Sequence, residues 1–153
     1  MTSEVKASSD ANSLPLLSVN DLTIKIPGVY GDISIVSGID LAIGDGEIVG
    51  LVGESGCGKS LTGLAIMGLL PRGVESTGEI LWQEKSLLPM TPKERREMMG
   101  KDIAMVYQDP LLSLNPGMTI YQQLSQILKR SHDGSGITPG DLLKMVHLTD
   151  SDA

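Results

Sequence analysis

One short segment of the chain has residue types and spacing suited to holding an anion. Residues 53–60 read Gly-Glu-Ser-Gly-Cys-Gly-Lys-Ser. Glycines let the backbone turn tightly, because they tolerate positive φ, and they leave backbone N–H groups open to an anion. In this pattern Lys59 contacts the terminal phosphates of a nucleotide, and the Ser60 hydroxyl ligates Mg²⁺. The segment therefore predicts a phosphate-binding loop, or P-loop.

The flanking residues predict the strand and helix that such a loop needs. Residues 47–52 form a short apolar run, which is typical of a buried parallel strand. Residues 61–70 carry apolar side chains at helical spacing, and Pro71 is expected to end that helix. The helix would point its positive amino end at the phosphates. A chance match among 18 glycines is the alternative, and these flanks argue against it.

Composition indicates a soluble globular domain. The chain has 153 residues, of which 41% are hydrophobic and 20% charged. It has no apolar run long enough to span a bilayer and no secretory signal pattern at its start. Residues 1–13 are rich in small polar side chains and are expected to form a disordered tail. A single cysteine excludes an internal disulfide and fits a reducing cytosol.

The net charge of −7 argues against a protein whose main role is to bind nucleic acid, since such proteins usually present a basic face. A local anion site is still compatible with that charge, because a P-loop works through backbone amides and one lysine.

The remaining pattern predicts an α/β fold: a P-loop core with an antiparallel β element at the N-terminus and a helical segment after Gln108. An Asp45-Gly46 turn separates the second expected strand from the run before the P-loop. The expected strands are 16–26, 33–43, 78–82 and 103–107. The expected helices begin at the caps Thr91, Thr119 and Thr138 and end near 99, 129 and 147.

A second segment, Gln-Asp-Pro-Leu-Leu-Ser-Leu-Asn-Pro at 108–116, follows the last expected strand. With the P-loop and its flanks it resembles the ATP-binding subunit of an ABC transporter, in the peptide-importer branch (dipeptide and oligopeptide, with the related nickel importers). The segments "LAIMGLLP", "GEILW" and "MTPKERREMMGKDIAMVYQDP" also resemble that branch. The resemblance covers residues 16–150.

The resemblance implies ATP and Mg²⁺ as ligands. Gln108 is similar to the Q-loop glutamine, which with Ser60 would hold Mg²⁺ and would sense the γ-phosphate. Tyr30 is similar to the aromatic residue that stacks on adenine. Leu61 stands where the family often has serine or threonine, so only its backbone N–H is available. The expected ligand-binding residues are Tyr30, Gly53, Glu54, Ser55, Gly56, Cys57, Gly58, Lys59, Ser60, Leu61 and Gln108.

Each of these roles has a simpler alternative. Tyr30 can be an ordinary residue at the end of a Pro-Gly turn, and Gln108 a solvated loop residue. Cys57 fits a small residue at a variable loop position, although a thiol reagent there would block nucleotide. Residues 111–120 are apolar for a loop, and they suit either core packing or a groove for a helix of a membrane subunit.

Other charged and titratable residues are expected on the surface. Lys93, Arg95 and Arg96 form a charge run that suits a solvated helix face. His132 and His147 lie beside no plausible nucleophile, so we expect neither to be catalytic.

The motifs that complete hydrolysis in this family do not occur in the sequence. It has no Leu-Ser-Gly-Gly-Gln signature, no Walker B strand ending in Asp-Glu and no switch histidine after such a pair. We therefore expect residues 14–153 to be the N-terminal part of an ABC nucleotide-binding domain, truncated before the signature. No catalytic residue is assigned within the chain, and Lys59 and Gln108 are supporting groups. Efficient turnover by the chain alone is not expected.

The resemblance implies an ATP-binding subunit that powers uptake of peptides or a related small solute. Its partners would be a second nucleotide-binding subunit, two transmembrane permease subunits and an extracytoplasmic solute-binding protein. It would lie peripherally on the cytoplasmic face of the membrane. A nucleotide-binding module without turnover, such as a truncated product or a regulator, is one alternative. A non-transport ABC ATPase acting on nucleic acid is another, and the net charge counts against it.

Overall fold

The residues described by this computed structural model are 14–131 and 136–148, and they fall into two units that divide between Ala104 and Met105. Each unit is considered by itself below. The expected tail at 1–13 and His132 lie outside the described residues.

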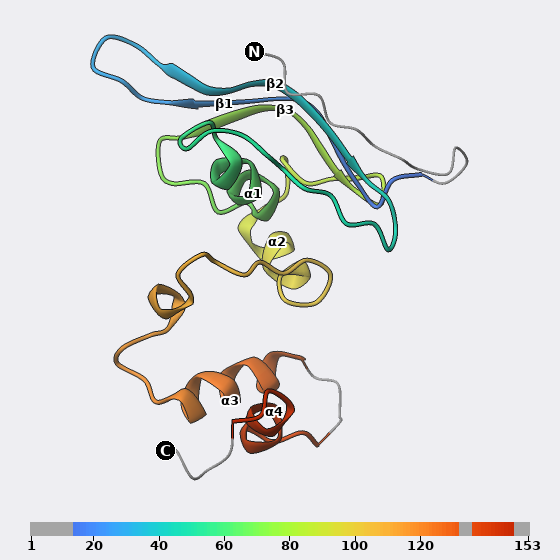
Figure 1. Cartoon of the computed structure of the whole chain (residues 1–153), viewed down its shortest axis with the longest axis vertical. Helices are drawn as coiled ribbons and strands as arrows, with labels where there is room; N and C mark the ends of the chain where they lie inside the picture. Colours follow the sequence, from blue (N-terminus) through green and yellow to red (C-terminus); the bar gives the residue numbers. More distant parts are fainter. Residues whose placement is uncertain (1–13, 132–135, 149–153) are drawn as a thin grey trace. The chain divides into compact units, whose positions relative to one another are not determined.

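The first unit is built on a four-stranded antiparallel sheet (Figure 1). Its strands are β1 (Leu17–Ile26), β2 (Ile33–Ile43), β3 (Glu75–Trp82) and β4 (Lys85–Ser86), in the order β2-β1-β3-β4. The expected antiparallel element at the N-terminus is confirmed, and β3 begins three residues earlier than predicted. The two-residue β4 was not predicted from the sequence.

A bulge in β1 keeps one face of that strand in the core. Leu17 and Val19 are buried, and then Leu22 and Ile24 are buried, so the alternation shifts by one residue at Asn20–Asp21. The pairing register with both neighbouring strands shifts at the same place. Because side chains alternate with a period of two, one extra residue is what returns Leu22 and Ile24 to the face of Val19.

Two helices belong to this unit: α1 (Lys59–Met67) and α2 (Pro92–Met98). Figure 1 shows α1 against one face of the sheet, with α2 close to it. The helices contribute Ala65 and Met98 to the buried cluster formed by the sheet residues. The helix after the P-loop begins two residues earlier than predicted and ends at Met67, where Gly68 adopts a left-handed conformation, rather than at Pro71.

Two predicted strands are absent from the described residues. Residues 47–52 and 104–107 have no regular structure, and Ile103 forms only an isolated bridge to Met99. The side chains of Ile48 and Val106 are 98% and 92% exposed. A buried parallel strand needs a hydrogen-bonded neighbouring strand, and within the described residues neither segment has one.

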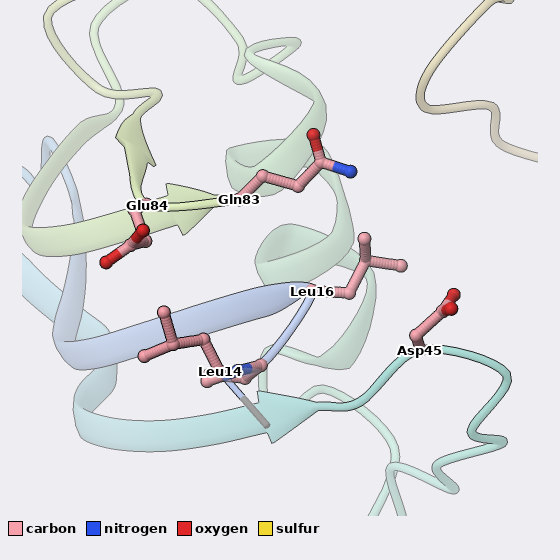
Figure 2. A pocket seen from close by; sticks show the side chains of 6 residues that line it. Leu14, Leu16, Asp45, Gln83 and Glu84 are labelled. Carbon is pink, nitrogen blue, oxygen red and sulfur yellow. The ribbon is translucent and has the colours of Figure 1, made fainter. Parts of the chain in front are cut away.

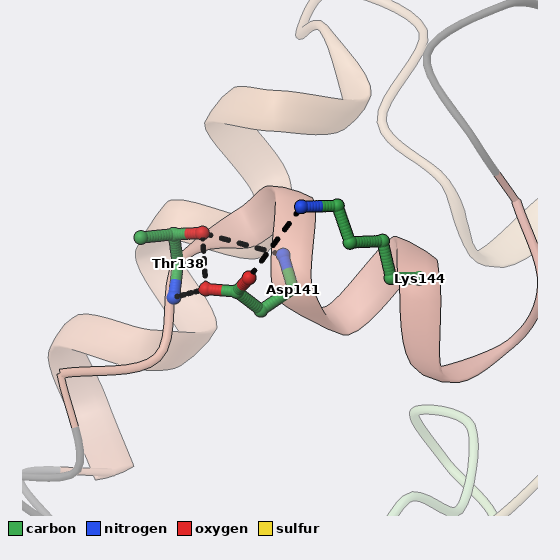
Figure 3. A network of polar contacts seen from close by, with 3 residues as sticks. All are labelled: Thr138, Asp141 and Lys144. Atoms are coloured by element: carbon green, nitrogen blue, oxygen red, sulfur yellow. Dashed lines mark hydrogen bonds and ion pairs between the residues drawn. The ribbon is translucent and has the colours of Figure 1, made fainter.

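The second unit contains a 3-10 turn (Pro110–Ser113) and two helices, α3 (Ile120–Ser131) and α4 (Pro139–Met145). The caps at Thr119 and Thr138 are confirmed. At α4, the Thr138 backbone N–H and hydroxyl both donate to the Asp141 carboxylate, and Lys144 lies 3.9 Å from the other oxygen of that carboxylate (Figure 3). Local hydrogen bonding therefore fixes where these short helices begin.

Candidate phosphate-binding site

The glycine-rich segment 53–60 forms a turn that leads directly into α1. Gly56 and Gly58 have φ angles of 82° and 95°, in the left-handed region that glycine adopts readily. A Cβ on Gly58 would overlap the Val36 side chain, and one on Gly53 would lie 2.7 Å from the Cys57 Sγ. Glycine thus meets a conformational requirement at Gly56, a packing requirement at Gly53 and both at Gly58.

Lys59 closes the loop on itself. Its ammonium donates to the backbone carbonyl oxygens of Gly53 and Glu54, at 2.8 and 2.6 Å, and it lies 3.4 Å from the Cys57 Sγ. No carboxylate within the described residues forms an ion pair with this ammonium. The positive charge is thus held by uncharged carbonyls, which an anionic phosphate can replace as a stronger electrostatic partner.

The amino end of α1 has the open donors that an anion requires. Gly58 is the N-cap and offers no side-chain cap, and the first intrahelical bond from Thr62 reaches back to its carbonyl. The backbone N–H groups of Lys59, Ser60 and Leu61 donate to no other described residue. Together with the dipole of the helix, these amides form a ready anion site.

The two residues that follow Lys59 differ in the exposure of their side chains. Ser60 is exposed and its hydroxyl bonds to no other described residue, so it is open to a metal–phosphate complex. The Leu61 side chain is half-buried against the core and only its backbone N–H faces the loop end of the helix. No cluster of three acidic, histidine or cysteine residues occurs among the described residues. The donor set fits Mg²⁺ held mainly by phosphate oxygens and water, which is how this ion often binds with nucleotides.

Tyr30 is fully exposed in the turn between β1 and β2. The same end of β2 lies near the loop, because a Cβ on Gly58 would touch Val36, three residues after the start of the strand. Tyr30 lies three residues before the start of that strand, and the structure gives no contact between its ring and the loop. Its part in binding adenine stays a prediction.

Gln108 belongs to the second unit, where it is exposed and starts the turn before the 3-10 segment. The neighbouring Asp109 accepts a hydrogen bond from the Leu111 backbone N–H at 3.2 Å, which fixes this turn. Leu111, Leu114 and Ile120 are exposed. Within the second unit these three side chains are not packed in a core, and both interpretations of residues 111–120 stay predictions.

Arg95 is the residue whose surroundings differ most from expectation. It was predicted to lie on a solvated face, yet it is only 9% exposed, and burial lowers the pKa of its guanidinium. Its Nη1 donates to the carbonyl oxygen of Ile66 at 2.5 Å. Arg96 remains exposed, as predicted. The i, i+3 spacing of Arg95 to the buried Met98 was the available signal, because that spacing puts both on one helix face.

A separate pocket lies at another edge of the sheet (Figure 2). It is lined by Leu14, Pro15, Leu16, Asp45, Gln83 and Glu84. Asp45 and Glu84 come from different turns and their carboxyl groups point in different directions in this view. None of the predicted ligand-binding residues lines it, so we assign it no part in phosphate binding.

Comparison with known proteins agrees with this geometry. Residues 36–152 match the family model described as "ABC transporter". The oligopeptide transport ATP-binding protein OppD of Bacillus subtilis is 42% identical over 74% of this chain and 32% of its own length. The dipeptide transport ATP-binding protein DppD of that species is 41% identical over 75% of this chain and 35% of its own length.

A further relative gives the longest coverage among these matches. The dipeptide transport ATP-binding protein DppD of Haemophilus influenzae is 35% identical over 92% of this chain and 44% of its own length. The chain thus spans about a third to under half of the length of these relatives. Among the described residues, no helix combines the length and the apolar character needed to cross a bilayer.

Proposed function

Because the chain belongs to the ABC transporter family, we propose that it binds Mg²⁺–ATP at residues 53–61 as part of a peptide importer's ATP-binding subunit. The observation that carries the proposal is the amino end of α1, where three unpaired amides stand beside the Lys59 ammonium. Bound ATP would supply the free energy of phosphoryl transfer. The residues of this chain would hold, orient and neutralise its phosphates.

Each residue has a distinct part in that proposal. The amides of the glycine-rich loop and of Lys59, Ser60 and Leu61 would surround the phosphate chain. Lys59 would leave the carbonyls of Gly53 and Glu54 and contact the phosphates instead. The Ser60 hydroxyl and the Gln108 amide oxygen would ligate Mg²⁺, since both are hard oxygen donors. The exposed Tyr30 ring would stack on the base.

The proposed partners follow from what the relatives are named for. A peptide importer's ATP-binding subunit would work with a second nucleotide-binding subunit and two transmembrane permease subunits. An extracytoplasmic solute-binding protein would deliver the peptide. The chain would then lie on the cytoplasmic face of the membrane, and the exposed apolar residues Leu111, Leu114 and Ile120 offer a surface for a permease helix.

We further propose that the chain by itself binds nucleotide without efficient turnover. The sequence contains no signature motif, Walker B glutamate or switch histidine, and hydrolysis depends on such groups for positioning and charge stabilisation. Single-turnover assays of the 153-residue chain with labelled ATP test this proposal. A rate equal to that of an intact subunit would refute the proposal.

The test of binding is a calorimetric titration of the chain with Mg²⁺–ATP. Lys59→Ala removes the ammonium in the loop, whereas Lys93→Ala removes an equally charged, exposed lysine from α2. We expect saturable binding to the native chain, at least about a tenfold loss for Lys59→Ala and no change for Lys93→Ala. The absence of saturable binding to the native chain, or equal effects of the two variants, would contradict the proposed function.

A further inference from the structure

The carbonyl groups at the carboxyl end of α1 accept hydrogen bonds from two kinds of donor, backbone N–H groups and a guanidinium. The backbone N–H of Gly68 donates to the Ala65 carbonyl at 3.0 Å, and that of Leu69 donates to the Leu64 carbonyl at 2.8 Å. These bonds satisfy two of the carbonyls that a helix end leaves open. The next carbonyl, that of Ile66, accepts from the Arg95 guanidinium of α2.

Arg95 fits closely against this helix end. A Cβ on Gly68 would lie 3.1 Å from both the Cζ and the Nε of Arg95, and 3.3 Å from its Cδ. Gly68 also has a φ of +67°. Glycine at this position therefore allows the helix to end there and leaves room for the guanidinium. The side chain is therefore held between the two helices along much of its length.

Within the described residues, the guanidinium of Arg95 bonds to the carboxyl end of α1 and forms no ion pair with an acidic side chain. The ion pair found within the described residues, between Lys144 and Asp141, does not involve it. A cation at the carboxyl end of a helix is stabilised by the helix dipole, and more so where it is partly buried. α2 itself is fixed by the capping box of Thr91 and Glu94 and by Met98 in the core. Arg95 therefore links α2, which is held in place by its own contacts, to the carboxyl end of α1.

We propose that Arg95 is a positioning residue for the phosphate site. By holding the carboxyl end of α1, it fixes the direction in which the amino end of that helix presents the amides of Lys59, Ser60 and Leu61. The inference rests on the proposed function, since it concerns the affinity of the same site for nucleotide.

The length of α1 explains how an effect reaches from one end to the other. Nine helical residues span roughly 13 Å, so a tilt of about 5° at one end moves the other by about 1 Å. A bound phosphate depends on several amides pointing at it together, so such a shift weakens several hydrogen bonds at once. We expect nucleotide affinity to fall by roughly 5- to 10-fold when the tie is lost.

The test compares variants of the full 153-residue chain at a temperature where all are folded. Arg95→Met keeps an unbranched side chain but removes the charge and the donors, and Arg95→Lys retains both charge and donors. Arg96→Met is the matched control, because Arg96 is the next residue in α2 and is exposed. Gly46→Ala costs stability through the positive φ of Gly46, and the added Cβ meets no atom within 4 Å, so it reports the effect of lost stability alone.

Two quantities are measured: the dissociation constant for Mg²⁺–ATP, and the amide ¹H–¹⁵N shifts of residues 58–61 without nucleotide. We expect Arg95→Met to raise the constant about 5- to 10-fold and to move those amide signals. Arg95→Lys should recover at least half of the loss on a logarithmic scale, and the two controls should stay within about twofold of the native chain. A folded Arg95→Met chain that binds within twofold, or a lysine variant that recovers nothing, would overturn the inference.

The inference can still be tested if Arg95→Met does not fold or if the native chain binds no nucleotide. If Arg95→Met does not fold, Gly68→Ala replaces it, because the added Cβ displaces the guanidinium; an effect below about twofold would then overturn the inference. If the native chain binds no nucleotide, the proposed function fails. The inference is then decided by whether Arg95→Met, unlike Arg96→Met, moves the amide signals of residues 58–61.

Discussion

The Lys59 ammonium donates a 2.6 Å hydrogen bond to the backbone carbonyl oxygen of Glu54, within the loop that leads into α1. It donates a second hydrogen bond, at 2.8 Å, to the carbonyl oxygen of Gly53, so the Lys59 side chain lies within its own loop. An anion that binds to this lysine would exchange the two carbonyl contacts for contacts of its own. The side chains around Lys59 should therefore report on nucleotide binding.

The alkylation rate of Cys57 should report nucleotide binding to the loop. Its Sγ lies 3.4 Å from the Lys59 Nζ, it is exposed, and it is the one cysteine in the sequence. We predict that saturating Mg²⁺–ATP slows alkylation of Cys57 by at least about tenfold, because the phosphates cover the loop. Mass spectrometry of the intact chain measures the rate. In Lys59→Ala the nucleotide should give little protection, and equal rates with and without ATP in the native chain would count against the site.

Gly58 should be far less tolerant of a side chain than Gly46. Both have positive φ, 95° and 69°, so alanine costs roughly 1–2 kcal/mol at each through backbone strain. At Gly46 the added Cβ meets nothing within 4 Å, whereas at Gly58 it overlaps the Val36 side chain and the start of α1 must shift. We predict that Gly58→Ala loses about 1–3 kcal/mol more stability than Gly46→Ala in urea unfolding. Equal losses would show that the overlap is relieved without cost.

Gly78 should be equally restricted at the β1 bulge. A Cβ there would overlap the backbone carbonyl oxygen of Asp21, and the φ of Gly78 is +101°. Backbone atoms of a paired strand cannot move aside as a flexible side chain can. We predict that Gly78→Ala destabilises the first unit by at least about 2 kcal/mol more than Gly100→Ala, where φ is +78° and no atom lies within 4 Å. Thermal unfolding of the two variants compares them, and similar midpoints would contradict this account of the bulge.

The α2 capping box should make the free energy of unfolding depend on pH. The hydroxyl and backbone N–H of Thr91 donate to Glu94, and these bonds lower the pKa of that carboxyl in the folded chain. A lowered folded-state pKa means that the contribution is present at neutral pH and is lost as pH falls through the folded value. We predict that the stability gap between the native chain and Thr91→Ala narrows below about pH 4. Urea unfolding at pH 7 and pH 3.5 measures the gap, and an unchanged gap would be evidence against the box.

The features that sequence predicted well are those with local causes. The capping boxes at Thr91 and Thr138 each need only residues one turn apart, and the glycine pattern of the loop specifies its own backbone. The strands predicted at 47–52 and 103–107 depend instead on pairing with distant segments, and apolar runs do not reveal whether a partner is present. The charge of Arg95 predicts a solvated face, and only its spacing to Met98, which the structure shows to be buried, indicates otherwise.

The central claim is that phosphate binds to the amides at the amino end of α1. The most direct measurement is a ¹H–¹⁵N NMR titration of the native chain with Mg²⁺–ATP. We predict the largest shifts at the amides of Lys59, Ser60 and Leu61, saturating together, with the Gly46 amide unmoved. Saturable binding that shifts other residues and leaves these three unchanged would contradict the claim.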